Sequence, residues 1–195
     1  MRPPYGPAGA TLGGVRTKGQ LLVAEPQLGD PNFDRTVVLM VEHNAEGALG
    51  IVLNRPTDVT VVDAIPAWAD LASPPGVIHI GGPVEEQTGW CLAQLTPGDD
   101  QEGFAPVVGT LGMLDLEIDP TLVASRAVGL RLYAGYSGWG PGQLDWELQQ
   151  GAWIVVEADE SDPFLAGDTL WEQILLRQGG KTARLANFPR DLHLN

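Results

Sequence analysis

The chain has 195 residues, enough for one domain with a substantial core and few for two ordinary domains. Its 44% hydrophobic and 18% charged residues are typical of globular proteins. The net charge of −14 argues against direct binding of DNA or RNA, because phosphate backbones select basic surfaces. No apolar run or signal-like segment indicates a membrane or secretory route, and the single cysteine, Cys91, agrees with a reducing compartment, so we expect a cytoplasmic protein.

The first quarter of the chain reads as a tail followed by strands. Residues 1–18, rich in Pro, Gly and Ala, predict a flexible N-terminal tail, and residues 19–195 predict a single domain. An apolar run at 20–24 predicts a strand, and a turn-forming loop follows to Thr36. Residues 36–42 and 48–53 predict a hairpin, in which Gly47 is free to take a positive φ.

The middle of the chain carries weaker signals for secondary structure. Residues 58–71 have a helical spacing that Pro66 shortens or kinks. Residues 77–80 and 90–95 predict antiparallel strands. A weak strand near Val107 and a short helix near Thr121 follow.

The last third of the chain carries the clearest pattern. A strand at 128–133 leads into a glycine-rich turn, a helix from Pro141 to about Gln150 and a strand at 153–157. Residues 168–178 predict an amphipathic helix with Asp168 as N-cap. The chain is therefore expected to form one α+β domain, with a mixed, strongly curved, barrel-like sheet flanked by a few helices.

The turn beginning at Tyr133 predicts a site. Ser137, in Gly135-Tyr-Ser-Gly-Trp139, resembles a nucleophile elbow, although Trp139 replaces the final glycine of that motif. A hydrolase would also need a histidine base, and the chain offers His43, His79 and His193. The alternative is that Ser137 is simply a small residue in a tight turn.

A helix start after the same turn predicts anion binding. Free N–H groups at Gly142 and Gln143 suit an anion, and Tyr136 and Trp139 would wall the pocket. The alternative is that both aromatic rings pack into the core.

Two arginines beside the predicted hairpin have two interpretations. Arg35 and Arg55 either form buried pairs with carboxylates or bind an anionic ligand. Asp30 and Asn32 can cap the preceding turn. No spacing indicates a metal site or a cofactor motif, so none is expected.

Several segments together resemble the YqgE/AlgH family of bacterial proteins. The matching segments include Asp30-Pro-Asn-Phe33, Gly47 to Thr57, Gly81-Gly-Pro-Val84, Gly135 to Trp139 and Gly142-Gln-Leu144, followed by Glu147 and Trp153. The resemblance covers about residues 19–195 and implies one cytoplasmic α+β domain whose sheet curls towards a barrel. It implies no particular reaction and an indirect link to gene regulation. Relatives of this kind often carry alanine where Ser137 stands, which argues against a hydrolase.

We therefore expect a non-enzymatic binding or regulatory protein with a pocket for a small anionic ligand or a protein partner. The alternatives are a small hydrolase using Ser137 and a transcriptional regulator that acts without direct DNA binding. The expected pocket residues come from four loops: Asn32, Phe33, Arg35, Asn54, Arg55, Gly81, Gly82, Pro83, Tyr136, Ser137, Gly138, Trp139, Gly142 and Gln143.

Overall fold

The computed structural model describes residues 16–98, 101–165 and 167–189, so residues 1–15 of the expected tail lie outside the described part. The remainder of that expected tail contacts the domain. The buried Thr17 shares a hydrogen bond of 3.0 Å between its Oγ1 and Nδ1 of His43. Lys18 pairs with Glu42 at 3.3 Å.

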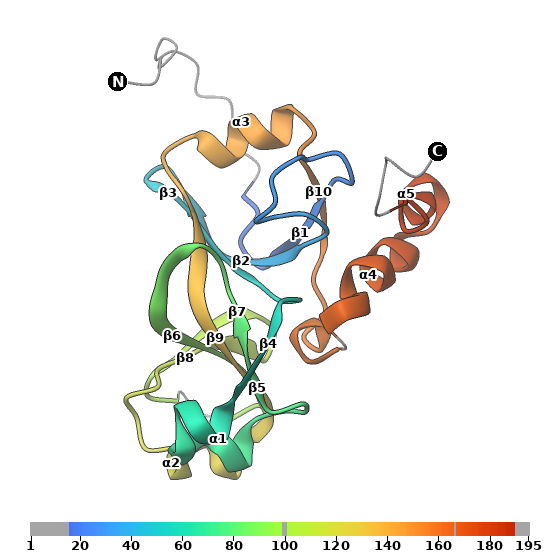
Figure 1. The fold of residues 1–195 in the computed structure, drawn as a ribbon. Helices are drawn as coiled ribbons and strands as arrows, with labels where there is room; N and C mark the ends of the chain where they lie inside the picture. Colours follow the sequence, from blue (N-terminus) through green and yellow to red (C-terminus); the bar gives the residue numbers. More distant parts are fainter. Residues whose placement is uncertain (1–15, 99–100, 166, 190–195) are drawn as a thin grey trace.

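One large sheet dominates the described residues (Figure 1). Its strands follow the order β10-β1-β2-β3-β9-β6-β8-β7, with β4 and β5 attached beside β9. β5 runs parallel to β9 and the other pairings are antiparallel, so the sheet is mixed as predicted. The strands are β1 (Gln20–Ala24), β2 (Val37–Asn44), β3 (Gly47–Val52), β4 (Pro56–Thr60), β5 (Val77–Ile80), β6 (Val84–Leu95), β7 (Phe104–Val108), β8 (Leu111–Leu114), β9 (Ala127–Trp139) and β10 (Trp153–Glu157).

The expected barrel-like curvature is not confirmed, because the sheet is open. Among the described residues, β10 and β7 end the path and do not pair with each other. The start of β1 nevertheless lies close to the end strand β7, since a Cβ added to Gly19 would lie 3.0 Å from the carbonyl oxygen of Val107. The mixed α+β class is confirmed.

Strand β9 runs further than the sequence predicts and connects the two parts of the sheet. Residues 127–136 pair with β6, and the last residues of β9 pair with β3, where Gly138 faces Leu49 and Trp139 faces Ala48. The expected turn at 133–139 is therefore wrong. The glycines in this stretch allow close packing of backbones: a Cβ on Gly82 would lie 2.2 Å from the carbonyl carbon of Tyr136.

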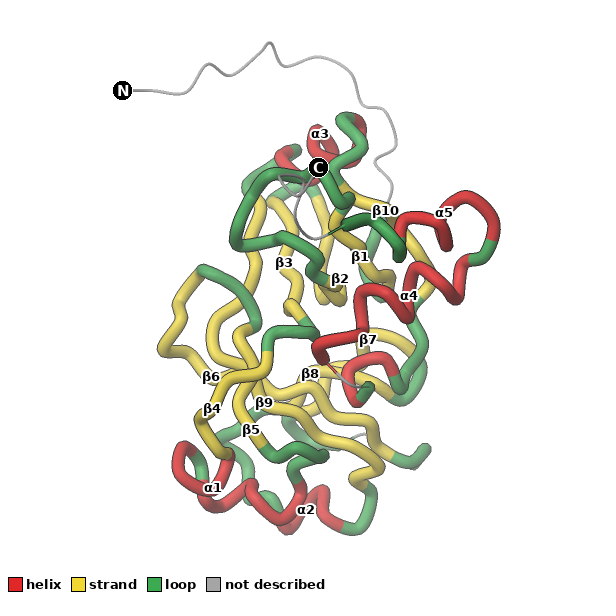
Figure 2. The backbone as a smooth tube through the Cα atoms, turned by 45° about the vertical axis from the view of Figure 1, so that its right-hand side comes forward, coloured by secondary structure: helices red, strands yellow, loops and turns green. Residues whose placement is uncertain are grey.

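Short helices lie around the sheet (Figures 1 and 2). The 58–71 segment divides at Pro66, as expected, into α1 (Val61–Ala64) and a 3-10 helix (Pro66–Leu71). α1 and α2 (Thr121–Ala124) lie at one end of the molecule and α3 (Gln143–Gln149) at the other. α4 (Leu170–Gln178) and α5 (Gly180–Leu185), the second of which the sequence did not predict, lie along one side.

The amphipathic pattern of α4 is confirmed, because Leu170, Trp171, Ile174 and Leu175 are buried in the largest core cluster. The N-cap is Thr169 rather than Asp168, which belongs to a preceding 3-10 turn. Within the described residues, no helix has the length and hydropathy needed to cross a membrane.

Candidate functional site

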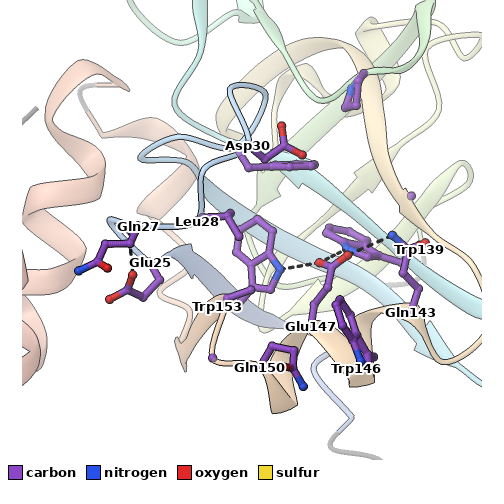
Figure 3. Close-up of a pocket in the computed structure, with 15 residues that line it drawn as sticks. Glu25, Gln27, Leu28, Asp30, Trp139, Gln143, Trp146, Glu147, Gln150 and Trp153 are labelled. Atoms are coloured by element: carbon purple, nitrogen blue, oxygen red, sulfur yellow. Dashed lines mark hydrogen bonds between the residues drawn. The ribbon is translucent and has the colours of Figure 1, made fainter. Parts of the chain in front are cut away.

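A well-defined cavity lies between the 25–36 loop and helix α3 (Figure 3). We call it the aromatic–acidic cavity; its volume is about 610 Å³. Residues of β9, of β10 and of the turn before β6 also line it. The lining residues are Glu25, Gln27, Leu28, Asp30, Phe33, Pro83, Gly138, Trp139, Gln143, Trp146, Glu147, Gln150, Gly151, Ala152 and Trp153.

Three aromatic rings from distant segments meet at this cavity. Phe33 stacks on Trp139 with ring centroids 6.1 Å apart, and it meets Trp153 edge-on at 5.3 Å. Trp139 and Trp153 also meet edge-on, at 6.1 Å. A fourth ring, that of Trp146 on α3, is 61% exposed. The cavity therefore has a fixed aromatic base and one ring that is free to contact a ligand.

Glu147 organises the polar side of the cavity (Figure 3). Its Oε2 accepts hydrogen bonds from the indole N–H groups of Trp139 at 2.9 Å and Trp153 at 2.8 Å. Its Oε1 accepts from Nε2 of Gln143 at 3.0 Å. These donors are all neutral, and no ion pair to Glu147 is found among the described residues. The carboxylate is thus held in place with its negative charge uncompensated by a cation.

The charge of this cavity has one sign. Among the described residues, its lining includes the carboxylates of Glu25, Asp30 and Glu147 and no lysine, arginine or histidine. Backbone N–H groups within the loop hold two of them, since Gln27 donates to Glu25 and Asn32 to Asp30. The expected Asp30 turn cap is therefore present. Aromatic faces beside carboxylates favour an organic cation over the anion that the helix start predicts.

The structure brings together five of the expected pocket residues. Phe33, Pro83, Gly138, Trp139 and Gln143 all line the aromatic–acidic cavity.

The other expected residues from the same loops line two smaller cavities around the 25–36 loop. Asn32, Gly82 and Arg55 lie in one of about 240 Å³, together with Pro83. The remaining pair, Arg35 and Asn54, lies with Arg55 in another of about 310 Å³. Pro83 and Arg55 link the three cavities, so the expected single pocket is a series of hollows around one loop.

Arg35 and Asn54 hold the loop in place. Arg35 pairs with Glu172 at 3.4 Å, lies 4.5 Å over the ring of Trp171 and donates to the carbonyl of Phe188. The buried arginine–carboxylate pairing predicted for Arg35 is confirmed. The Asn54 side chain accepts from the Val37 N–H at 2.9 Å and donates to the Arg35 carbonyl at 2.8 Å. Both side chains have structural partners.

Within the described residues, Arg55 does not form the carboxylate pair that was one of its two expected roles. It donates to the carbonyl oxygen of Asp34, a backbone group and not a carboxylate. Arg131, which is close in sequence to the candidate turn, is buried and donates to the carbonyls of Pro163, Leu165 and Pro74. Arg131 therefore braces the chain away from the cavity.

The geometric basis for a serine hydrolase is absent. Ser137 lies inside β9 with no exposed surface, and its hydroxyl lies 3.4 Å from the Gly81 carbonyl. A nucleophile must be able to reach its substrate, and the buried Ser137 hydroxyl cannot, so its role is structural. Gly81 is also buried, where a Cβ would lie 2.3 Å from the Gly135 carbonyl oxygen. Gly81 and Ser137 both lie where the backbone of residues 81–82 packs against the backbone of β9.

Tyr136 and Gly142 lie near the aromatic–acidic cavity without lining it. Tyr136 lines an adjoining open cavity and packs edge-on against Trp90 at 5.5 Å. Gly142 precedes α3 with φ +70, a left-handed conformation that suits glycine.

Sequence reasoning did not assign the acidic residues and Trp153 to the pocket. A signal was available, because Glu147 and Trp153 belong to the same shared motifs as Trp139.

Comparison with known proteins places the chain in a family. The AlgH-like family (DUF179) matches residues 21–183. The chain belongs to the AlgH-like family. This AlgH-like chain is 49% identical over 184 residues to the UPF0301 protein SCO2948 of Streptomyces coelicolor, covering 91% of the chain and 94% of the relative. It is 45% identical over 181 residues to a UPF0301 protein of Mycobacterium tuberculosis, covering 91% and 90%.

Two solved structures share the AlgH-like fold. The crystal structure of protein DIP2367 from Corynebacterium diphtheriae matches with a TM-score of 0.84 at 31% identity, over 88% of this chain and 92% of that one. The solution structure of AlgH from Pseudomonas aeruginosa matches with a TM-score of 0.66 at 28% identity, over 95% and 98%. The resemblance read from the sequence is confirmed.

Proposed function

We propose that this AlgH-like chain is a non-catalytic cytoplasmic binding protein whose aromatic–acidic cavity takes a cationic group, either an organic cation or a basic side chain. The observation that carries the proposal is that carboxylates and aromatic rings gather in one cavity, which no basic residue lines in the described ranges 16–98, 101–165 and 167–189. A cation attracted to a ring face and to a nearby carboxylate gains from both.

The position of Glu147 favours recognition over proton transfer. Its two oxygens accept three hydrogen bonds from fixed neutral donors, so the carboxylate is preorganised and needs little rearrangement to meet a cation. The exposed ring of Trp146, from the same helix, can close over an alkyl or guanidinium group. Binding of a partner's basic side chain is also compatible with regulation through protein contacts, whereas the acidic surface opposes direct DNA binding.

The proposal predicts that Glu147→Gln weakens binding of N-acetyl-argininamide about tenfold, the equivalent of one partly shielded charge pair. Glutamine keeps an oxygen that can accept from the indoles, so the cavity should retain its shape. Isothermal titration calorimetry at low and moderate salt measures the affinity, which should fall as salt rises.

Glu117→Gln is the matched control, because Glu117 is exposed and lies outside the cavity. It removes the same charge and should leave the affinity unchanged. Acetate that binds more tightly than N-acetyl-argininamide, or equal losses in the two variants, would contradict the proposal.

A further inference from the structure

A second cavity continues the aromatic–acidic cavity across strand β9. We call it the strand cavity; its volume is about 540 Å³, and it shares Gly138 and Trp139 with the first. It lies over the β2–β3 hairpin and the start of β6. Its lining residues are Glu42, Asn44, Glu46, Gly47, Ala48, Leu49, Val84, Tyr136, Gly138 and Trp139.

The strand cavity is acidic as well. The described residues that line it include Glu42 and Glu46 and no lysine, arginine or histidine. Glu42 pairs with Lys18 at 3.3 Å, and both side chains are nearly half exposed, so this pair adds little stability and can exchange for another cation. The two cavities therefore present carboxylates on both sides of their shared residues.

Gly138 lines both cavities. It lies exposed on β9, and its backbone conformation is not left-handed. A Cβ there would lie 3.2 Å from a ring carbon of Tyr136 and 3.8 Å from Val84. A glycine is therefore not required by φ at this position, and its lack of a side chain leaves the strand surface shared by the two cavities uncovered.

We propose that the two cavities form one docking groove for an extended basic segment of a partner protein. This rests on the cation binding proposed above: one basic side chain enters the aromatic–acidic cavity, the segment crosses Gly138, and a second basic side chain meets Glu42 and Glu46. Charge complementarity carries the choice of occupant, because five carboxylates line the groove and, within the part of the chain that the structure describes, no basic side chain lines it, Lys18 reaching Glu42 from outside the lining.

The amide groups in the groove favour a peptide over a polyamine. Gln27 and Gln150 line the first cavity and Asn44 the second. An amide both donates and accepts hydrogen bonds, as a peptide backbone does, whereas a polyamine at neutral pH offers donors alone.

Calorimetry on the full chain tests this with three probes: N-acetyl-argininamide, the peptide acetyl-Arg-Gly-Arg-Gly-Arg-amide and spermine. We expect the peptide to bind about tenfold more tightly than the single arginine. The double variant Glu42→Gln/Glu46→Gln should abolish this gain and leave the affinity for the single arginine unchanged. Glu102→Gln/Glu117→Gln, at exposed residues outside the groove, is the control and should preserve the gain.

Substitutions of Gly138, where the segment would cross from one cavity to the other, provide a second test. Gly138→Leu should reduce peptide affinity more than single-arginine affinity, while Gly138→Ala should have a small effect on both. Circular dichroism confirms that each variant is folded.

The outcomes separate the two proposals. Equal affinity for the peptide and the single arginine, or a gain that survives Glu42→Gln/Glu46→Gln, overturns the groove and leaves cation binding intact. Spermine that binds as tightly as the peptide through the same carboxylates overturns the choice of a peptide. Failure of both arginine probes to bind overturns cation binding itself.

Discussion

At the scale of single residues, glycines in this chain serve close packing as much as turns. Gly82 has φ +153, and a Cβ on it would lie 2.2 Å from the carbonyl carbon of Tyr136. The sequence predicted that Gly81, Gly82 and Gly138 line a binding pocket. Gly81, Gly82 and Gly135 instead let residues 81–86 and 133–137 approach closely, which no composition signal distinguishes from a turn.

Gly82→Ala should therefore destabilise the protein by more than about 2 kcal/mol, because the methyl group meets backbone that cannot move aside. Urea unfolding measures the change in the free energy of unfolding. Gly76→Ala is the control: Gly76 also has a positive φ of +70, but nothing lies within 4 Å of its added Cβ. Equal losses in both variants would show that φ alone, and not the contact with Tyr136, sets the cost.

The candidate site was predictable in part at this scale. Phe33, Trp139 and Gln143 stand beside turn-forming residues and were correctly expected to share a cavity. The sign of its charge was not predictable, because Glu25 and Asp30 reach it from a loop more than a hundred residues away from Glu147. Only the fold brings those carboxylates together. Ser137 was expected in the pocket because a serine between glycines has the same local sequence in a strand as in a nucleophile elbow.

At the scale of elements, local patterns predicted strands well where the strand is a short run of apolar residues. The 153–157 strand and the 37–52 hairpin are present as expected. The first half of β6 was missed because Glu85, Glu86, Gln87 and Thr88 are polar and exposed. Its pairing with β9 is a long-range contact, and sequence periodicity does not report it.

An ion pair joins the C-terminal part of helix α4 to the 3-10 helix (Asp162–Phe164) that follows β10. Arg177 donates to both oxygens of Asp162, at 2.6 and 3.0 Å, and Asp162 is fully buried whereas the Arg177 side chain is 38% exposed. Removing the arginine leaves a buried carboxylate whose other side-chain hydrogen bond comes from the Asp159 N–H, as far as the described residues show.

We expect Arg177→Ala to cost about 2–3 kcal/mol in unfolding free energy and to increase hydrogen exchange along α4. Arg184→Ala, at an exposed arginine on α5, is the matched control and should cost under about 0.5 kcal/mol. Comparable losses from the two substitutions would show that Asp162 does not anchor the helix.

At the scale of the whole molecule, stability should depend on pH through His79. Burial, and then the charge of Arg131, lowers the pKa of His79 from 6.5 to about 4. Below pH 6.5, His79 of the unfolded chain binds a proton, whereas His79 of the folded protein stays neutral until about pH 4. The stabilisation is therefore complete above pH 6.5 and is lost as the pH falls towards 4.

The wild-type protein should lose on the order of 3 kcal/mol through this group between pH 6.5 and 4. His79→Gln has no such proton, so its unfolding free energy should fall less steeply over the same range. Denaturant unfolding at several pH values makes the comparison, and parallel curves for the two proteins would contradict the assignment.

The 25–36 loop has a consequence for how the protein is made. β1 pairs with β10, Trp171 donates to the Ala24 carbonyl, and Arg35 donates to the carbonyl of Phe188. The segment that walls the cavity therefore leaves the ribosome more than a hundred residues before its partners. A nascent chain cannot complete the cavity until Trp153 has emerged, so any partner that recognises the finished cavity distinguishes a chain translated past this strand from a shorter one.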